Sequence, residues 1–143
     1  MNAQTLVEHA LRLLLRQDMA AFAALWAEDG ILEFPFAAAD YPPRVEGRAA
    51  VTEYLRGYPD MLEIKEIPTP VVHQSVDPEV VIVEFEAAGT VVATAAPYRM
   101  RYIAVITVRD GEIQRYRDYW SPQAAAEAMG GTEALHAFGG ARS

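Results

Sequence analysis

The chain has 143 residues, of which 52% are hydrophobic and 10% aromatic, so it can form one domain with a single core. Its 20 acidic residues outnumber 12 Lys and Arg, and the net charge of −8 argues against binding to a nucleic-acid backbone. Cysteine is absent, which excludes disulfides and thiolate metal sites.

Neither a metal site nor a membrane segment is expected. The three histidines, His9, His73 and His136, are too scattered for metal-ligand spacing. Charges interrupt the apolar stretches well short of bilayer length, and the N-terminus lacks a basic region followed by an apolar segment. These features predict a metal-free cytoplasmic protein with no membrane partner.

The first half of the chain carries a helical pattern. Residues 5–16 have an apolar stripe at helical spacing, which predicts a first helix. Asp18 suits the cap of a second helix, which turns Trp26 inward and stops at Gly30. The two together predict a helical hairpin with one apolar side.

A short strand and a third helix follow. The strand is expected over residues 31–36, and residues 37–46 form a loop that leads to Gly47. The helix after Gly47 is expected to bury Tyr54 and to end before Pro59. This completes a helical layer.

The second half alternates between apolar and polar residues, which predicts antiparallel strands over residues 66–74, 80–92, 98–108 and 112–120. Pro68 and Pro70 remove N–H donors from the first strand, which places it at the sheet edge. Asp110-Gly111 predicts a hairpin between the last two. The prediction is therefore an α+β fold in which helices cover a bent sheet and enclose an apolar pocket.

A last helix is expected from Ser121-Pro122 through Met129, because Ser suits the cap and Pro the first helical position. The predicted domain covers residues 1–130, and residues 131–143 are expected to form a loosely ordered tail.

The last strand offers a candidate for acid/base chemistry. One face carries Gln114, Tyr116, Asp118 and Trp120, and the other carries Ile113, Arg115, Arg117 and Tyr119. The two arginines favour solvent or a subunit contact, so Asp118 is expected to point inward. A carboxylate facing an apolar cavity is poorly solvated, which raises its pKa toward the range useful for proton transfer.

Two other interpretations of Asp118 stay open on pattern alone. In one, the opposite face of the strand points inward, so that Asp118 faces solvent. In the other, Asp118 pairs with an arginine of the neighbouring strand, such as Arg99 or Arg101. Glu84 and Glu86 also share one face, but glutamates that alternate with apolar residues are typical of any half-solvated strand.

Aromatic residues lie where the helical layer meets the sheet, and most such residues form core. The candidates for the walls of a substrate pocket are Trp120, Phe34, Phe36, Trp26 and Tyr102. The loop residues Asp40, Tyr41 and Arg44 could close the pocket mouth, although a solvated surface loop is the simpler interpretation.

Four motifs carry a family resemblance: Phe34-Pro35-Phe36, Glu46-Gly47-Arg48, Arg109-Asp110-Gly111-Glu112-Ile113 and Arg117-Asp118-Tyr119-Trp120. With the order of elements, they resemble the nuclear-transport-factor-2-like superfamily, and within it the SnoaL-like polyketide cyclases. The resemblance covers the chain to about Gly130 and implies a cone-shaped α+β barrel. The superfamily includes isomerases, cyclases, dehydratases, epoxide hydrolases and binding modules, so the fold alone transfers little function.

The ketosteroid isomerase branch shares the closing Tyr119-Trp120-Ser121 pattern but not the catalytic residues. Its general base matches Phe34, its oxyanion tyrosine about Ala10 and its oxyanion aspartate about Ala104. Phe and Ala neither transfer protons nor donate hydrogen bonds, so steroid isomerase activity is not expected.

In SnoaL-like cyclases the acid/base aspartate of the last strand matches Asp118, in agreement with the parity argument. The phenazine-biosynthesis A/B proteins are also similar: they share the Gly47-Arg48 helix start and have a glutamate where Asp118 stands. Their helix histidine matches Tyr54, so their condensation chemistry is not carried over.

The resulting hypothesis is a small cofactor-independent enzyme that binds a hydrophobic carbonyl-containing metabolite and moves a proton next to the carbonyl, in cyclisation or isomerisation. Asp118 is the expected acid/base, with Tyr116 and Tyr54 as hydrogen-bond donors to the enolate. One alternative is a non-catalytic binding module, in which Asp118 is tied to an arginine. Another is an epoxide hydrolase or dehydratase, which needs a second carboxylate or an arginine beside Asp118.

The other face of the sheet, which carries Arg115, Arg117 and Tyr119, needs cover unless it is well solvated. Relatives of this fold commonly dimerise through that face, so the resemblance implies a homodimer.

Overall fold

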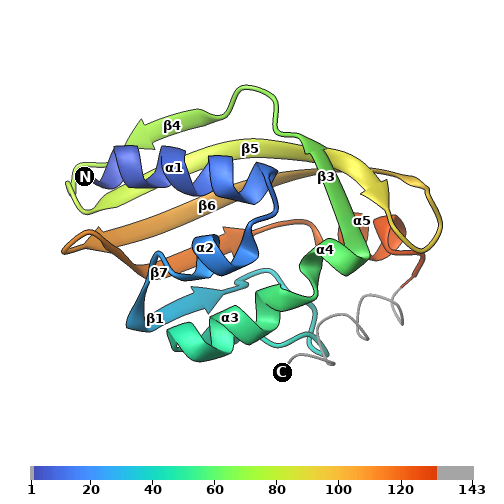
Figure 1. Ribbon diagram of the computed structural model, residues 1–143, viewed down its shortest axis with the longest axis horizontal. Helices are drawn as coiled ribbons and strands as arrows, with labels where there is room; N and C mark the ends of the chain where they lie inside the picture. The colour runs from blue at the N-terminus through green and yellow to red at the C-terminus, as the bar shows by residue number, and fades with distance from the viewer. Residues whose placement is uncertain (1, 132–143) are drawn as a thin grey trace.

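The computed structural model describes residues 2–131, which fold into two layers. Helices α1 (Ala3–Leu15), α2 (Met19–Ala23) and α3 (Arg48–Arg56) lie across one face of a curved sheet (Figure 1). The predicted α+β architecture, with the helices of the first half on a bent sheet, is confirmed. Within the described residues, no helix has the length and apolar character needed to cross a membrane.

The sheet has seven strands: β1 (Trp26–Glu33), β2 (Arg44–Glu46), β3 (Leu62–Glu66), β4 (Val71–Gln74), β5 (Val80–Val91), β6 (Pro97–Arg109) and β7 (Glu112–Tyr119). Their order is β2-β1-β7-β6-β5-β3, and β4 also pairs with β5. All pairs are antiparallel except β1 with β7, which is parallel. The strands predicted in the second half pair antiparallel as expected. The one parallel pair arises because the early strand β1 joins the sheet beside the last strand.

The second helix is shorter than predicted. Asp18 caps it as expected, accepting a hydrogen bond from the Ala21 N–H at 3.1 Å. The helix ends at Ala23, however, and Trp26 begins β1, where it is the register partner of Ile113 in β7. The assignment of Trp26 to the second helix is wrong because tertiary strand pairing overrides a short helical pattern.

Only β4 (residues 71–74) lies within the strand expected over residues 66–74, and β3, which begins at Leu62, ends where that strand was expected to begin. Pro68 and Pro70 lie in the gap between them, where their missing N–H groups cannot contribute to a ladder. Both strands pair with β5 at the end of the sheet, so the predicted edge position is confirmed. A short helix that was not predicted, α4 (Tyr58–Met61), leads into β3.

The sheet closes tightly where β3 meets β5. Gly89 in β5 is the register partner of Ile64 in β3, and a Cβ atom at Gly89 would lie 1.7 Å from the carbonyl oxygen of Glu63. Only glycine permits this approach. It brings β3 across the end of the sheet, on the side where the helices lie (Figure 1).

The hairpin between β6 and β7 forms at the predicted turn. Asp110 has φ 55° and Gly111 has φ 75°, the positive values of a type I′ turn. Helix α5 (Pro122–Ala128) also begins where predicted, with the Ser121 hydroxyl accepting from the Ala124 N–H at 3.1 Å. The tail predicted for residues 131–143 lies outside the described residues apart from its first glycine.

A bulge near the start of β7 changes which side chains point inward there. Thr107 is the register partner of Arg115, whereas Val108 is the partner of Ile113, so Gln114 is the extra residue. Ile113 is therefore fully buried, and Gln114 donates a hydrogen bond to an exposed aspartate. The predicted alternation is wrong for these two residues and correct from Arg115 onward.

Candidate active site

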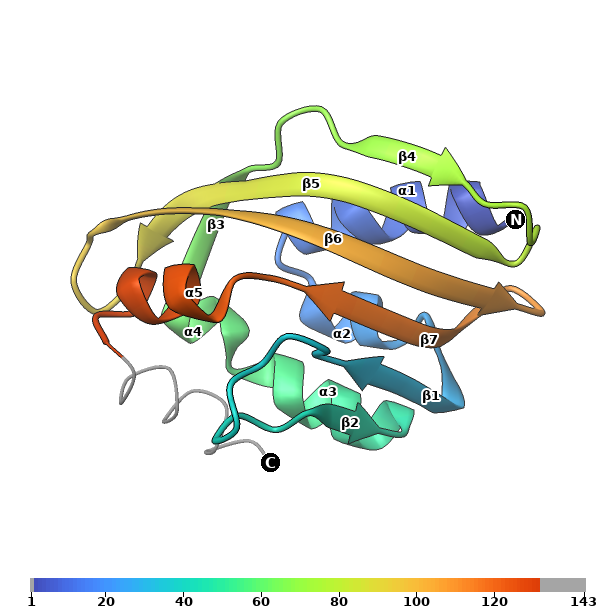
Figure 2. The same cartoon turned by 180° about the vertical axis from the view of Figure 1, so that it is seen from behind.

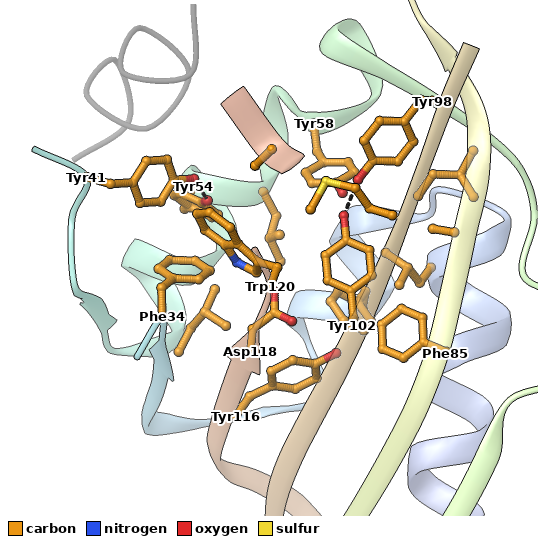
Figure 3. Close-up of a pocket in the computed structure, with 18 of the residues that line it drawn as sticks. Phe34, Tyr41, Tyr54, Tyr58, Phe85, Tyr98, Tyr102, Tyr116, Asp118 and Trp120 are labelled. Carbon is orange, nitrogen blue, oxygen red and sulfur yellow. Dashed lines mark hydrogen bonds between the residues drawn. The ribbon is translucent and has the colours of Figure 1, made fainter. Parts of the chain in front are cut away.

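An apolar pocket of about 100 Å³ lies between the concave face of the sheet and the helices (Figure 3). Strands β1, β5, β6 and β7 supply much of its wall, and Ala125 and Met129 contribute from the α5 region. Aromatic rings make up more than half of the lining residues. Among the described residues that line it, Asp118 is the only one with a charged side chain.

Asp118 reaches the pocket from β7 and points into it between Tyr116 and Trp120 (Figure 3). The prediction that the Asp118 side chain points inward is confirmed. Its Oδ1 atom is buried and has no hydrogen-bond partner among the described residues. Burial disfavours the charged carboxylate and raises the pKa of Asp118 to about 7. At neutral pH the group is therefore divided between a base and an acid.

The arginines that could have neutralised Asp118 lie on the other face of the sheet. Arg99 forms an ion pair with Glu86, and Arg101 Nε lies 3.6 Å from the same carboxylate. The alternative in which Asp118 pairs with one of these arginines is wrong. Neither arginine lines the pocket, so the condition set for an epoxide hydrolase or dehydratase is not met by them.

Tyrosine hydroxyls form two clusters in the pocket wall. Tyr41 and Tyr54 are hydrogen-bonded to each other, and so are Tyr98 and Tyr102. Tyr58 from α4 lies beside Tyr98 and Tyr102 in the same part of the pocket wall (Figure 3). We refer to Tyr58, Tyr98 and Tyr102 as the β6 hydroxyl cluster.

Burial is the largest cause of the raised pKa values of Tyr54, Tyr58, Tyr98 and Tyr102, and the charge of Asp118 raises them further. These four tyrosines therefore stay neutral across the physiological pH range. A neutral phenol can donate a hydrogen bond to an oxygen that becomes negative during a reaction.

Tyr116 is beside Asp118 on the pocket floor and belongs to neither cluster. Its ring stacks on Trp26, with centroids 5.5 Å apart, and meets Phe22 edge-on at 6.3 Å. The pKa of Tyr116 is raised first by burial and then by the charge of Asp118. The ring is held in place while its hydroxyl points toward the pocket interior (Figure 3).

Most residues predicted as walls do line the pocket. Phe34 is central to one side, with its ring centroid 5.9 Å from Trp120 and 5.4 Å from Tyr54. Trp26 and Tyr102 line the pocket as well. The structure therefore brings together all but one of the predicted site residues.

The exception is Phe36, whose placement in the pocket is wrong. β1 ends at Glu33, and a turn at Pro35 and Phe36 carries the Phe36 ring away from the interior. Phe36 is 62% exposed and packs edge-on against Tyr119, on the face opposite Asp118. The strand alternation that would have kept Phe36 beside Phe34 stops before it reaches Phe36.

Three lining tyrosines were missed. Tyr41 is only 4% exposed, so the interpretation of its loop as solvated is wrong for this residue. Asp40 and Arg44 are exposed as expected, with Arg44 paired to Glu46 at 2.7 Å. Tyr98 could have been found, because it lies four residues before Tyr102 and so shares its strand face. Tyr58 continues the helical spacing of Tyr54 and Leu55, which predicts its burial, but it was not assigned to the pocket, and it begins α4 instead of ending the third helix.

The other titratable candidates lie outside the pocket. His73 pairs with Glu84 at 2.7 Å, on strands β4 and β5, and both side chains are about half exposed. Within residues 2–131, no group of three or more His, Cys, Asp or Glu side chains is arranged to hold a metal ion.

Comparison with known proteins agrees with this geometry. Residues 7–116 match the model of the SnoaL-like domain. An uncharacterized PhzA/B-like protein of Pseudomonas aeruginosa is 35% identical over 134 residues, which is 94% of each chain.

The chain is also similar to solved structures. The structure of a candidate isomerase from Bacillus subtilis is 41% identical, with a TM-score of 0.85 over 92% of this chain and 98% of that one. A candidate polyketide cyclase from Xanthomonas campestris pv. campestris is 26% identical, with a TM-score of 0.73 over 85% of this chain and 91% of that one.

Proposed function

We propose that this chain, which belongs to the SnoaL-like family of the nuclear-transport-factor-2-like superfamily, is an enzyme of cofactor-independent proton transfer. Its substrate is a hydrophobic carbonyl compound, and the reaction is an isomerisation or a cyclisation. The observation that carries the proposal is the unpaired carboxylate of Asp118 in an otherwise uncharged pocket. The relatives named as isomerase and polyketide cyclase candidates support the same reaction classes.

Asp118 is the base in the first step. Its carboxylate takes a proton from the carbon next to the substrate carbonyl, and the C–H electron pair moves to form an enolate. A pKa of about 7 leaves much of the group ionised at neutral pH while keeping its basicity high. The protonated Asp118 then returns the proton to another carbon in an isomerisation, or to the new alkoxide after the enolate carbon attacks a second carbonyl.

Tyr116 is the proposed donor to the enolate oxygen. Its neutral hydroxyl lies on the same strand face as Asp118, and the stacked Trp26 fixes its ring. A donor that is already oriented stabilises the developing charge without reorganisation. Tyr54, already hydrogen-bonded to Tyr41, is a second candidate for this role.

Exchange of substrate protons for deuterium tests the proposal with a set of model ketones in place of the natural substrate. A panel of cyclic ketones and aromatic polyketide fragments is incubated in deuterated buffer, and exchange next to the carbonyl is followed by proton NMR. Wild-type protein should accelerate exchange in at least one compound, and Asp118→Asn should lower that rate by about 10²–10⁴-fold.

Glu86→Gln is the matched control, because it removes a carboxylate from the opposite face of the same sheet. Its exchange rate should equal that of the wild type. Exchange that survives in Asp118→Asn would overturn the role of Asp118, and binding without exchange would support a non-catalytic binding module.

We further propose that the chain is a homodimer through the outer face of the sheet, which no described helix covers (Figure 2). The outer-face groove is lined by Phe36, Val71, Glu86, Ile103 and Tyr119, among others. Phe36, Val71 and Ile103 are 62%, 50% and 44% exposed, an unusual concentration of apolar surface on one face.

A further inference from the structure

We infer that the pocket selects a small, uncharged carbonyl compound, of about one six-membered ring or an equivalent short chain. The inference rests on the proposed function, because it specifies the substrate class of the same site. It is carried by the pocket's volume, the packing of its walls and the charges of its lining.

The volume sets the upper limit. The pocket holds about 100 Å³. A cavity of about 150 Å³ in a protein core accommodates benzene, whereas pockets for drug-sized ligands are about 300–1,000 Å³. The Asp118 pocket is smaller than either and closest to the benzene cavity, so a compound of no more than about one ring suits it, and a fused polycyclic compound exceeds it.

The walls resist widening because their aromatic rings support one another. Phe85 stacks on Tyr102 with centroids 5.1 Å apart, and Trp26 stacks on Tyr116. The Tyr98–Tyr102 hydrogen bond joins two residues of the β6 hydroxyl cluster above them. Moving one ring would disturb its neighbours, since interiors at crystal-like density deform little.

The charges of the lining exclude an anionic substrate. Among the described residues around the pocket, none has a cationic side chain, and Asp118 would repel a second carboxylate. A buried charge without a partner is costly, so a carboxylate or phosphate ester of the right size is disfavoured. The tyrosine hydroxyls can instead bind the oxygen of a neutral carbonyl or alcohol.

A series of ring sizes with constant chemistry tests the inference. Dissociation constants of cyclohexanone, decalone and a tetracyclic steroid ketone are measured by two-dimensional NMR titration of the labelled protein. Burial of apolar area alone predicts tighter binding with every added ring. We expect the reverse, with cyclohexanone bound at least about tenfold more tightly than decalone, because overpacking opposes the larger ring.

A variant that enlarges the pocket gives the converse test. Met100 lines the pocket from β6, and Met100→Ala should strengthen decalone binding about tenfold while changing cyclohexanone binding little. Ile106→Ala is the matched control, because Ile106 is buried on the same face of β6 but does not line the pocket. It should keep the wild-type order of affinities.

Cyclohexanecarboxylate tests the charge requirement at nearly constant size, and it should not saturate the protein above pH 7. Tighter wild-type binding of decalone or the steroid, saturable binding of the carboxylate, or no binding of any ketone would overturn the inference. These outcomes are separate from those of the deuterium exchange. Small ketones that bind without exchange would leave the size limit standing and remove the proposed reaction, whereas exchange confined to large ketones would do the opposite.

Discussion

The two faces of the sheet place carboxylates in opposite environments. On the inner face, the Asp118 carboxylate is surrounded by rings and its Oδ1 has no hydrogen-bond partner among residues 2–131. On the outer face, Glu86 lies against Arg99 and Arg101. The pocket carboxylate loses hydration without compensation, which raises its pKa, whereas the outer one gains cationic partners.

The environment of a carboxylate in this sheet therefore depends on which face of its strand carries it. Strands β5, β6 and β7 each contribute one side to the pocket and the other to solvent. A carboxylate on one side has ion-pair partners, whereas the buried one on the other side has a raised pKa. The following changes test this contrast, from the largest expected effect to the smallest.

The largest effect on folding is expected from Asp118→Asn. An unfolded aspartate titrates near 3.8 and the folded Asp118 near 7, so between these pH values the folded state binds the extra proton. The wild type therefore loses stability as pH rises through this window, because stability falls with pH wherever the folded state holds more protons. Asn cannot ionise, so its free energy of unfolding should exceed that of the wild type by up to about 4 kcal/mol above pH 8.

Urea denaturation at several pH values measures this difference, which should shrink to near zero at pH 4. Glu86→Gln is the comparison from the outer face, where loss of a partly exposed ion pair should cost less than about 1 kcal/mol. Equal effects of the two variants at pH 8, or an Asp118 carboxyl resonance that titrates near 4 in wild-type protein, would contradict the assigned contrast.

A smaller effect is expected from removing one phenol oxygen on each face. Tyr102→Phe removes the hydrogen bond between the Tyr102 and Tyr98 hydroxyls, so the free energy of unfolding should fall by about 1–2 kcal/mol. Tyr119→Phe keeps the ring contact with Phe36 and should change stability by less than about 0.5 kcal/mol. Thermal unfolding of both variants beside wild type checks the order, and a larger loss in Tyr119→Phe would reverse the interpretation.

Ile103→Glu is expected to change the stability of the single chain least, but to change the oligomeric state. This charge in the outer-face groove should convert the proposed dimer into monomers, because a buried unpaired carboxylate opposes association. Val76→Glu is the control, since Val76 is fully exposed away from the groove. Light scattering after size exclusion measures the mass; a monomeric wild type, or a dimer that tolerates Ile103→Glu, would refute the assembly.

Much of the candidate site follows from local sequence pattern. The alternation along β7 favoured Asp118 and Tyr116 inside and Arg115 and Arg117 outside, because successive side chains of a strand point to opposite faces. The pattern alone left the reverse facing open, and the resemblance to SnoaL-like cyclases favoured the inward one. The spacing of Tyr98 and Tyr102 carried the same information for β6, although only Tyr102 was recognised. The turn at Asp110 and the cap at Ser121 were equally readable, since each depends on a few neighbouring residues.

Three features of the site depend on tertiary structure and not on local sequence pattern. The bulge at Gln114, the parallel pairing of Trp26 with β7 and the turn that removes Phe36 from the pocket depend on segments far apart in the chain. Tyr41 reaches the pocket from a loop that has no periodic pattern, and Tyr58 reaches it from a short helix that was not predicted.

The sequence by itself determined the α+β class, the helical layer and the apolar character of the pocket, and it favoured the inward face for Asp118. Only the tertiary structure decided the size of the pocket, the absence of a cationic partner for Asp118 among the described residues and the joining of the tyrosines into two clusters. The physical reason is the distance along the chain over which each effect acts. Periodicity and turn chemistry act over a few residues, whereas desolvation and packing depend on every element that closes around a side chain.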